Sequence, residues 1–181
     1  MALGVESLVI GSHLWFFRDG AAITVPAAGT ASKTVKPGAL DPLWVKLGAI
    51  MTSGITPARG EPVEVWAPQP GRLRRTNVHR PKQDFKISVT VGEWTMLIVE
   101  AIWGCQALAS NATQFNPLAG SAIKGWFKVE WIDDNDVLRF TVDTYGEMTV
   151  SDEVAIAPDK LAEVKLEILP IWSSLMTGAI H

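Results

Sequence analysis

The stretch Phe85-Lys-Ile-Ser-Val-Thr-Val91 carries the clearest strand pattern in the chain. Its apolar residues stand at every second position with polar residues between them, so successive side chains are expected on opposite faces of a sheet. The pattern changes at Gly92. The next stretch, Glu93-Trp-Thr-Met-Leu-Ile-Val-Glu-Ala-Ile-Trp-Gly104, spaces its apolar residues by three and four and predicts an amphipathic helix.

The ends of this helix are also suggested by the sequence. Glu93 is expected in the first turn, where the helix dipole favours a carboxylate, and Gly104 is expected to end the helix. Met96, Val99 and Trp103 make the second side of the helix apolar as well. We therefore expect a helix over about residues 93–104 that is covered on more than one face.

Further alternating stretches predict more strands. Residues 43–47 and 63–65 alternate before a turn at residues 68–71, and residues 162–168 alternate near the end of the chain. Residues 126–132 and 137–143 alternate around the acidic turn Asp133-Asp-Asn-Asp136, which predicts a β-hairpin. The predicted fold is mainly β: an antiparallel β-sandwich or partly closed barrel with one flanking helix at about residues 93–104.

Two segments lack such periodicity. Residues 26–42 consist mostly of Ala, Gly, Ser, Thr, Lys and Pro and predict an extended, exposed loop. A loop of this length is usually functional or mobile, and this one could be an arm that orders only against another subunit. Residues 171–181 form a C-terminal tail without a clear period. The whole chain, residues 1–181, is expected to form a single domain.

Composition excludes several classes of protein. The chain has 181 residues, of which 48% are hydrophobic and 19% charged, and this excludes a disordered chain. No run reaches the roughly 18 to 20 apolar residues of a membrane span. The N-terminus lacks the basic start and apolar core of a secretory signal, and the lone Cys105 excludes an intrachain disulfide. We expect a soluble globular domain made in a cytoplasm.

Tryptophan content and charge distribution both point to contacts with other subunits. Eight tryptophans are more than a domain of this size usually hides completely, and tryptophan is enriched in interface cores. Residues 1–92 carry 11 Lys and Arg against 6 Asp and Glu, whereas residues 93–181 carry 5 against 13. A basic surface of one copy could therefore meet an acidic surface of the next, while a nucleic-acid surface is disfavoured by the net charge of −3.

A search for catalytic or metal-binding residues finds no convincing set. The three histidines, at positions 13, 79 and 181, are scattered, and none has a metal-ligand spacing to another His or to Cys. Cys105 follows the predicted C-terminus of the helix, where the dipole raises a thiol pKa, so a buried structural thiol is favoured. The acidic turn lacks the glycine and late glutamate of an EF-hand calcium loop. We predict no enzyme activity, no metal and no cofactor.

The basic run from Arg72 to Lys82 has three interpretations. It lacks the interleaved aromatics of a nucleic-acid surface, so the default is a solvated connection between strands. The third interpretation is a protruding basic loop that meets the acidic half of another copy. The residues predicted at subunit or ring contacts are Trp44, Arg72, Arg74, Arg75, Arg80, Lys82, Asp133, Asp134, Asp136 and Trp172, together with the 26–42 loop.

The order of these features resembles the tail tube (major tail) proteins of long-tailed bacteriophages. The resemblance runs from about residue 40 to 170, through Trp44-Val-Lys-Leu-Gly-Ala-Ile50 and Glu64-Val-Trp-Ala-Pro68 to Glu100-Ala-Ile-Trp-Gly104. It continues through Lys124-Gly-Trp-Phe-Lys-Val-Glu130, the acidic turn and the late strand at residues 163–169. Type VI secretion tube proteins are similar in fold to this family.

The resemblance implies a structural role. Six copies would form a ring, and rings would stack into a hollow virion tail tube through which DNA is ejected. The implied partners are the chain itself and the tape-measure, tail-tip and tail-terminator proteins, with assembly in the cytoplasm of the bacterial host and no membrane contact. Acidic residues of the second half are expected to line much of the lumen, because phosphate binding depends on Lys and Arg.

Two other classes of function stay open at this stage. A tryptophan-rich β-sandwich could be a binding module, with exposed rings stacking on carbohydrate or another ligand. An enzyme is the third possibility and has no visible nucleophile, base or metal set to support it.

Overall fold

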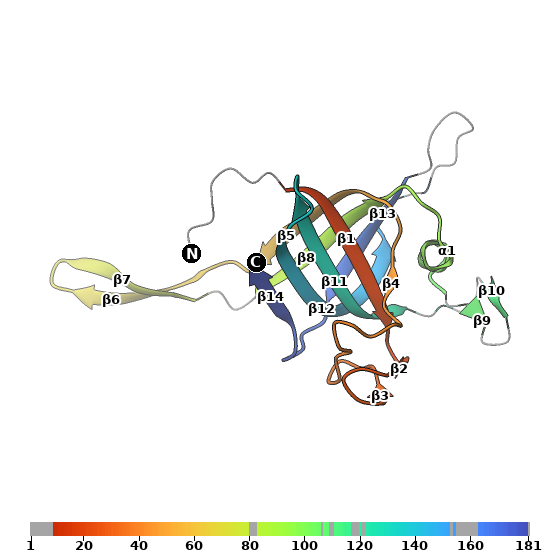
Figure 1. Cartoon of the computed structure of the whole chain (residues 1–181). Helices are drawn as coiled ribbons and strands as arrows, with labels where there is room; N and C mark the ends of the chain where they lie inside the picture. The colour runs from red at the N-terminus through yellow and green to blue at the C-terminus, as the bar shows by residue number, and fades with distance from the viewer. Residues whose placement is uncertain are drawn as a thin grey trace.

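The computed structural model describes residues 9–79, 83–105, 107–108, 111–116, 120, 122–152, 154 and 163–180. An antiparallel sheet of eight strands dominates it, in the order β4-β1-β11-β12-β13-β8-β5, with β14 also paired to β12 (Figure 1). The sheet does not close into a barrel, and the predicted mainly β, antiparallel fold is confirmed. Its strands are β1 (Val9–Arg18), β4 (Val45–Lys46), β5 (Ile50–Arg59), β8 (Gln83–Val91), β11 (Ile123–Asp133), β12 (Leu138–Val150), β13 (Val164–Pro170) and β14 (Thr177–Ile180).

Three two-stranded sheets and one helix complete the described residues. The helix α1 (Met96–Trp103) lies on the side of the sheet away from the β6–β7 hairpin, which projects far from the body (Figure 1). The small sheets are β2 (Ala22–Ile23) with β3 (Gly29–Thr30), β6 (Val63–Gln69) with β7 (Arg72–His79), and β9 (Ala107–Leu108) with β10 (Asn111–Phe115).

The stretches with the clearest alternation of apolar and polar residues form strands, as predicted. The inward residues of β8 that follow Phe85 are almost completely buried, and β11 and β12 form the predicted hairpin around the acidic turn. The late strand begins at Val164 and pairs with both β12 and β8. The apolar side chains at alternate positions therefore lie in the core, as expected for strands whose successive side chains point to opposite faces.

Two apolar cores lie on opposite faces of β11. The larger core takes Phe127 and Val129 and joins residues of β1, β8, β13 and α1. The smaller core takes Trp126, which is fully buried, together with Phe17 and Tyr145. Because both faces are covered, apolar residues such as Trp126 and Phe127 stand at consecutive positions of this strand.

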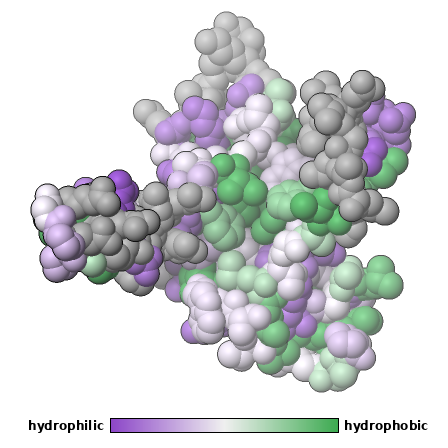
Figure 2. All heavy atoms as spheres, turned by 90° about the vertical axis from the view of Figure 1, so that its left-hand side faces the viewer, coloured by the Kyte–Doolittle hydropathy of each residue, from purple (hydrophilic) through white to green (hydrophobic). Residues whose placement is uncertain are grey.

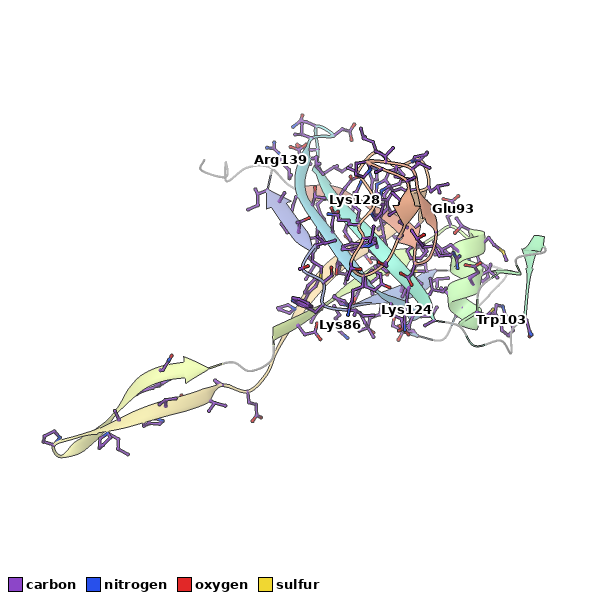
Figure 3. All side chains as sticks on the ribbon, turned by 90° about the horizontal axis from the view of Figure 1, so that it is seen from below. Lys86, Glu93, Trp103, Lys124, Lys128 and Arg139 are labelled. Carbon is purple, nitrogen blue, oxygen red and sulfur yellow. The ribbon has the colours of Figure 1, made fainter. Side chains whose placement is uncertain are left out.

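The helix is shorter than predicted at its N-terminus. Thr95 is the N-cap, and its hydroxyl accepts a hydrogen bond from the backbone N–H of Ile98. Glu93 therefore precedes the first turn, and its carboxylate instead accepts a hydrogen bond from the backbone N–H of Ala49 at 3.0 Å. Gly104 ends the helix as predicted, in the left-handed conformation with φ of 58°. Glu93 and Trp103 lie at opposite ends of α1 (Figure 3).

Residues 22–44 form a lobe that the rest of the chain holds in place. The buried Asp41 carboxylate accepts hydrogen bonds from the backbone N–H groups of Thr24, Val25 and Leu43, at 2.7 to 3.0 Å. These bonds close the lobe at its base, and β2 pairs with β3 inside it. Buried polar contacts of this kind fix a backbone that has little apolar surface of its own.

Contacts from distant strands anchor the same lobe to the body. Trp126 donates its indole N–H to the carbonyl of Ser32 at 2.8 Å, and the Ser173 hydroxyl donates to the carbonyl of Lys33 at 2.7 Å. The segment 26–42 is thus ordered by its own chain, which differs from the expected arm that orders only against another subunit. Its sequence lacks apolar periodicity because backbone hydrogen bonds, rather than side-chain burial, hold most of it.

Candidate subunit interface

The β6–β7 hairpin is the outward continuation of the β5–β8 ladder. Arg59 pairs with Gln83 at the end of the inner ladder, and Val63 pairs with His79 at the start of the outer one. Three positions, 60–62, separate the ladders on one side and three, 80–82, on the other, so the flanking pairs of the two ladders have the same register; residues 80–82 lie outside the described residues. One antiparallel ribbon therefore runs from the sheet into the hairpin, and it leaves the sheet beside Lys86 (Figure 3).

The outer half of this ribbon has exposed apolar side chains. Val63 is 56% exposed, Trp66 47% and Leu73 67%. At about 3.3 Å per residue, a strand of this length carries these side chains roughly 20 Å beyond the sheet. An isolated two-stranded hairpin is marginally stable in water, so an exposed apolar hairpin of this length is a candidate for docking onto another surface.

The basic run lies on this hairpin, as the interpretation of a protruding basic element requires. Arg75 forms an ion pair with Glu64 at 2.8 Å, and its guanidinium lies 5.5 Å from the centre of the Trp66 ring. Arg72 and Arg74 belong to β7 by their backbones. Arg80 and Lys82 lie outside the described residues.

The acidic turn holds one buried and two exposed carboxylates. Asp133 accepts hydrogen bonds from the backbone N–H groups of Asn135 and Val137, both at 2.9 Å, and forms an ion pair with Arg139. The hydrogen bond from Val137, with help from Arg139, holds the pKa of Asp133 below its usual value although burial acts in the opposite direction. Only Asp134 and Asp136 are exposed, so they are the acids of this turn that another subunit could reach.

The two tryptophans predicted at interfaces differ in their surroundings. Trp44 is half-buried, donates its indole N–H to the carbonyl of Gly38 at 2.8 Å, and has the Lys128 ammonium 4.8 Å from its ring centre. It therefore packs within its own chain. Trp172 is 78% exposed, in the segment between β13 and β14.

The other tryptophans confirm that this chain does not hide all eight rings. Trp126 alone is among the buried residues, and Trp94 and Trp103 near α1 are 41% and 54% exposed. Trp15 and Trp131 are intermediate; Trp15 donates to Glu130 and Trp131 to Ser53 across the sheet. The idea that every tryptophan belongs to the core is wrong.

The outer edge of β5 is a second surface that sequence reasoning missed. No described strand pairs with this edge, because β5 ends the order of the main sheet. Its first nine residues, 50–58, include no charged side chain, and Pro57 is the type of residue found on edge strands. An uncharged edge of this length invites pairing with another chain unless it is covered. Its Gly54 and Pro57 also concealed the strand in the sequence, because both residues normally disfavour strands.

No cluster of three or more His, Cys, Asp or Glu residues within the described part of the chain is placed to hold a metal ion. Cys105 is buried, and burial together with the nearby Glu100 carboxylate raises the pKa of its thiol, so it is poorly suited to act as a nucleophile. His13 lies 3.8 Å from Glu130 at the surface of the sheet.

Comparisons with known proteins include a coarse likeness to a solved structure. No protein-family model matches the chain, and no curated protein matches its sequence. The longest described helix is too short to cross a membrane. A chain of a solved extracellular contractile injection system, the PVC sheath–tube complex in its extended state, is similar over 98% of this chain and 95% of its own, with a TM-score of 0.46 and 8% sequence identity.

Proposed function

We propose that this chain is a self-assembling structural subunit of a tail tube, and that its role is mechanical rather than chemical. Six copies form a ring, rings stack into a hollow tube, and DNA passes through the tube during ejection. The tube grows in the host cytoplasm between tail-tip and terminator proteins around a tape-measure protein. The observation that carries this proposal is the ribbon whose outer half leaves the sheet with exposed apolar side chains.

The ribbon supports assembly because its inner half contributes to the folded sheet, whereas its outer half is available for contact with a neighbouring subunit. The inner half lies in the sheet and the outer half extends away from it (Figure 1). A contact between the hairpin of one copy and the body of the next joins two different surfaces. Such head-to-tail contacts give rings when the rotation closes and filaments when it does not.

Charge supports the same arrangement. The hairpin, residues 63–79, carries three arginines and one glutamate, for a net charge of +2. The whole chain has 16 basic and 19 acidic residues, so the remainder carries 13 and 18, or −5. A basic hairpin is attracted to the acidic body of another copy, which favours fast and correctly oriented association. Acidic residues from positions 93–181 supply much of the lumen surface in this proposal, so that DNA passes without adhering.

The proposal is tested by sedimentation velocity and negative-stain electron microscopy over a concentration series. Six-fold rings or hollow tubes are the expected result, weakened by salt because charge steers the contact. A clean monomer at every concentration, with purified tail-tip complex added, would overturn the proposal. A tryptophan fluorescence change on adding glycans to that monomer would instead support a binding module.

The unchanged register of the ribbon supplies a matched variant. Replacing residues 60–82 by Asn-Gly joins Arg59 directly to its partner Gln83 through a two-residue hairpin turn. The sheet should keep its far-ultraviolet circular dichroism and its unfolding temperature, while rings and tubes are lost. Tubes formed by this variant would show that the hairpin is not the assembly element.

A further inference from the structure

The main sheet has a gap near the root of the hairpin. β13 and β14 pair with the same edge of β12, but residues 171–176 leave the sheet between the pairs Gly146–Pro170 and Asp143–Thr177. The pairing of β13 with β8 stops at Ile87, so no described strand lies between residues 83–86 of β8 and the outer edge of β14.

This gap opens into an apolar hollow of about 350 Å³. Ile55 and Phe85 line it on one side, and Val142 and Met176 line it on the other. Hydrophobic atoms gather on the face from which the hairpin projects (Figure 2). A hollow of this kind exposes apolar surface that a monomer would ordinarily cover, so it marks a site for an apolar group from elsewhere.

Two acidic residues lie at the hollow or next to its lining residues, and one of them is already paired with a lysine. Asp84 is exposed beside Phe85. Asp143 also lines the hollow; one of its oxygens bonds to Lys36, and the other is buried and accepts no hydrogen bond from any described residue. The chain outside the hairpin carries a net charge of −5, so a partner that combines an apolar tip with basic side chains matches this body better than a neutral or acidic one.

The hairpin of the same chain cannot reach this hollow. The hairpin projects away from the sheet (Figure 1), so its tip points outward from the root instead of folding back. Leu73 lies one residue beyond the start of β7, close to the turn, and shares the hairpin with Arg75. A second copy of the chain is thus the partner that offers the required chemistry.

We propose that the hollow between β8 and β14 is the socket for the β6–β7 hairpin tip of a second copy, with Leu73 seated against Phe85 and Met176. This inference rests on the proposed function and adds the acceptor surface to it. The contact is head-to-tail, since hairpin and socket are different surfaces of one chain, and each bound copy presents a free hairpin to the next.

The first test fills the socket. Gly178 lines the hollow without a positive φ, and a Cβ there would meet only Thr141 and Val142 at 3.8 and 3.9 Å, an ordinary contact distance. Gly178→Phe should therefore fold normally and reduce the association constant at least tenfold in sedimentation velocity. The matched control is Gly29→Phe in the lobe, where the added Cβ would have one neighbour at 4.0 Å. Equal association by both variants would overturn the socket.

The second test links the two surfaces covalently. The native Cys105 is buried, so cysteines introduced at Leu73 and Gly178 are the reactive ones. Under mild oxidation, the double variant Leu73→Cys/Gly178→Cys should give a ladder of dimers, trimers and longer chains on non-reducing gels. Either single variant should stop at the dimer, because a ladder needs two different cysteines in each copy.

The outcomes separate this inference from the proposed function. Tubes without a ladder, and without an effect of Gly178→Phe, would overturn the socket and leave the tube proposal standing. Absence of any assembly by the wild-type chain, even with tail-tip complex, would overturn both. Binding of a small apolar dye that Gly178→Phe abolishes while assembly stays unchanged would show a ligand pocket in place of a socket.

Discussion

The inner and outer halves of the ribbon meet in the same register at their junction but differ in what covers them. In the inner half, Ile87 and Val89 of β8 are buried by the sheet and the main core. In the outer half, Trp66 and Leu73 are about half to two-thirds exposed. Both halves are antiparallel ladders, so backbone pairing alone does not distinguish them. A two-stranded hairpin without a core is marginally stable on its own, and in the proposed assembly a second copy covers the outer half.

The largest loss of stability is expected when a charge is introduced into the inner half of the ribbon. Ile87→Asp buries an unpaired carboxylate in the main core and should lower the free energy of unfolding by about 4 kcal/mol or more. Loss of the cooperative transition in urea, followed by circular dichroism, checks this. A variant that unfolded like wild type would show that the inner half does not depend on core burial.

A smaller loss is expected at the ion pair that fixes the helix to the sheet. Arg18 on β1 pairs with the buried Glu100 of α1. Arg18→Met removes the cation that pairs with this carboxylate and should cost about 3 kcal/mol, toward the low end for a broken buried pair because the Arg18 side chain is 33% exposed. Urea unfolding measures the loss, and Arg18→Met/Glu100→Gln should recover part of it. If the double variant recovered no stability, the loss would come from the missing packing of the Arg18 aliphatic chain and not from the ion pair.

Acid should weaken the body of the molecule before it affects the pairing of the ribbon. Burial acts to raise the pKa of Asp41, but the backbone N–H groups of Leu43, Val25 and Thr24 outweigh it and lower that pKa. The pKa of Asp133 is lowered as well. Both carboxylates therefore stabilise the fold above their ordinary value of 3.8, and this contribution is lost as the pH falls through the lowered values.

The acid effect is measured by the thermal midpoint at pH 7, 5 and 3. It should change little between pH 7 and 5 and fall by pH 3, and the fall should be smaller in Asp133→Asn, which has already lost the charge. An equal fall in this variant would assign acid sensitivity to other groups.

The smallest effect on folding is expected at the hairpin tip. Leu73→Asp should change the free energy of unfolding of the monomer by less than about 0.5 kcal/mol, because the side chain is exposed. The same variant should abolish tube formation, since it places a charge against an apolar hollow. If the variant kept both its stability and its ability to form tubes, the hairpin tip would not be needed for assembly.

Sequence reasoning succeeded where side-chain burial decides the structure. The alternating residues of β8 and β11 and the glycine that ends α1 were predicted because apolar periodicity and backbone conformation are local properties. The acidic turn was predicted for the same reason. The start of the helix was predicted too early, because Thr95 is the N-cap and the Glu93 carboxylate accepts a hydrogen bond from the backbone N–H of Ala49.

The remaining elements depend on contacts that a single sequence does not display. β5 and β14 are strands because their backbones pair, although glycine, proline and exposed residues hide the pattern. β7 was expected as a connection because its arginines obscure the alternation, and its partner β6 supplies the pairing. The gap beside β14 arises because residues 171–176 leave the sheet between β13 and β14, which periodicity cannot reveal. The pairing of Trp44 with Lys128 is likewise tertiary.

Amide hydrogen exchange of the ribbon, before and after assembly, tests the central claim most directly. In the monomer, amides of β6 and β7 should exchange orders of magnitude faster than those of β5 and β8, because only the inner half is held by the core. In the assembled tube both halves should be protected, since the outer half is then covered by another copy. Hairpin amides that stayed unprotected in the tube would contradict this account.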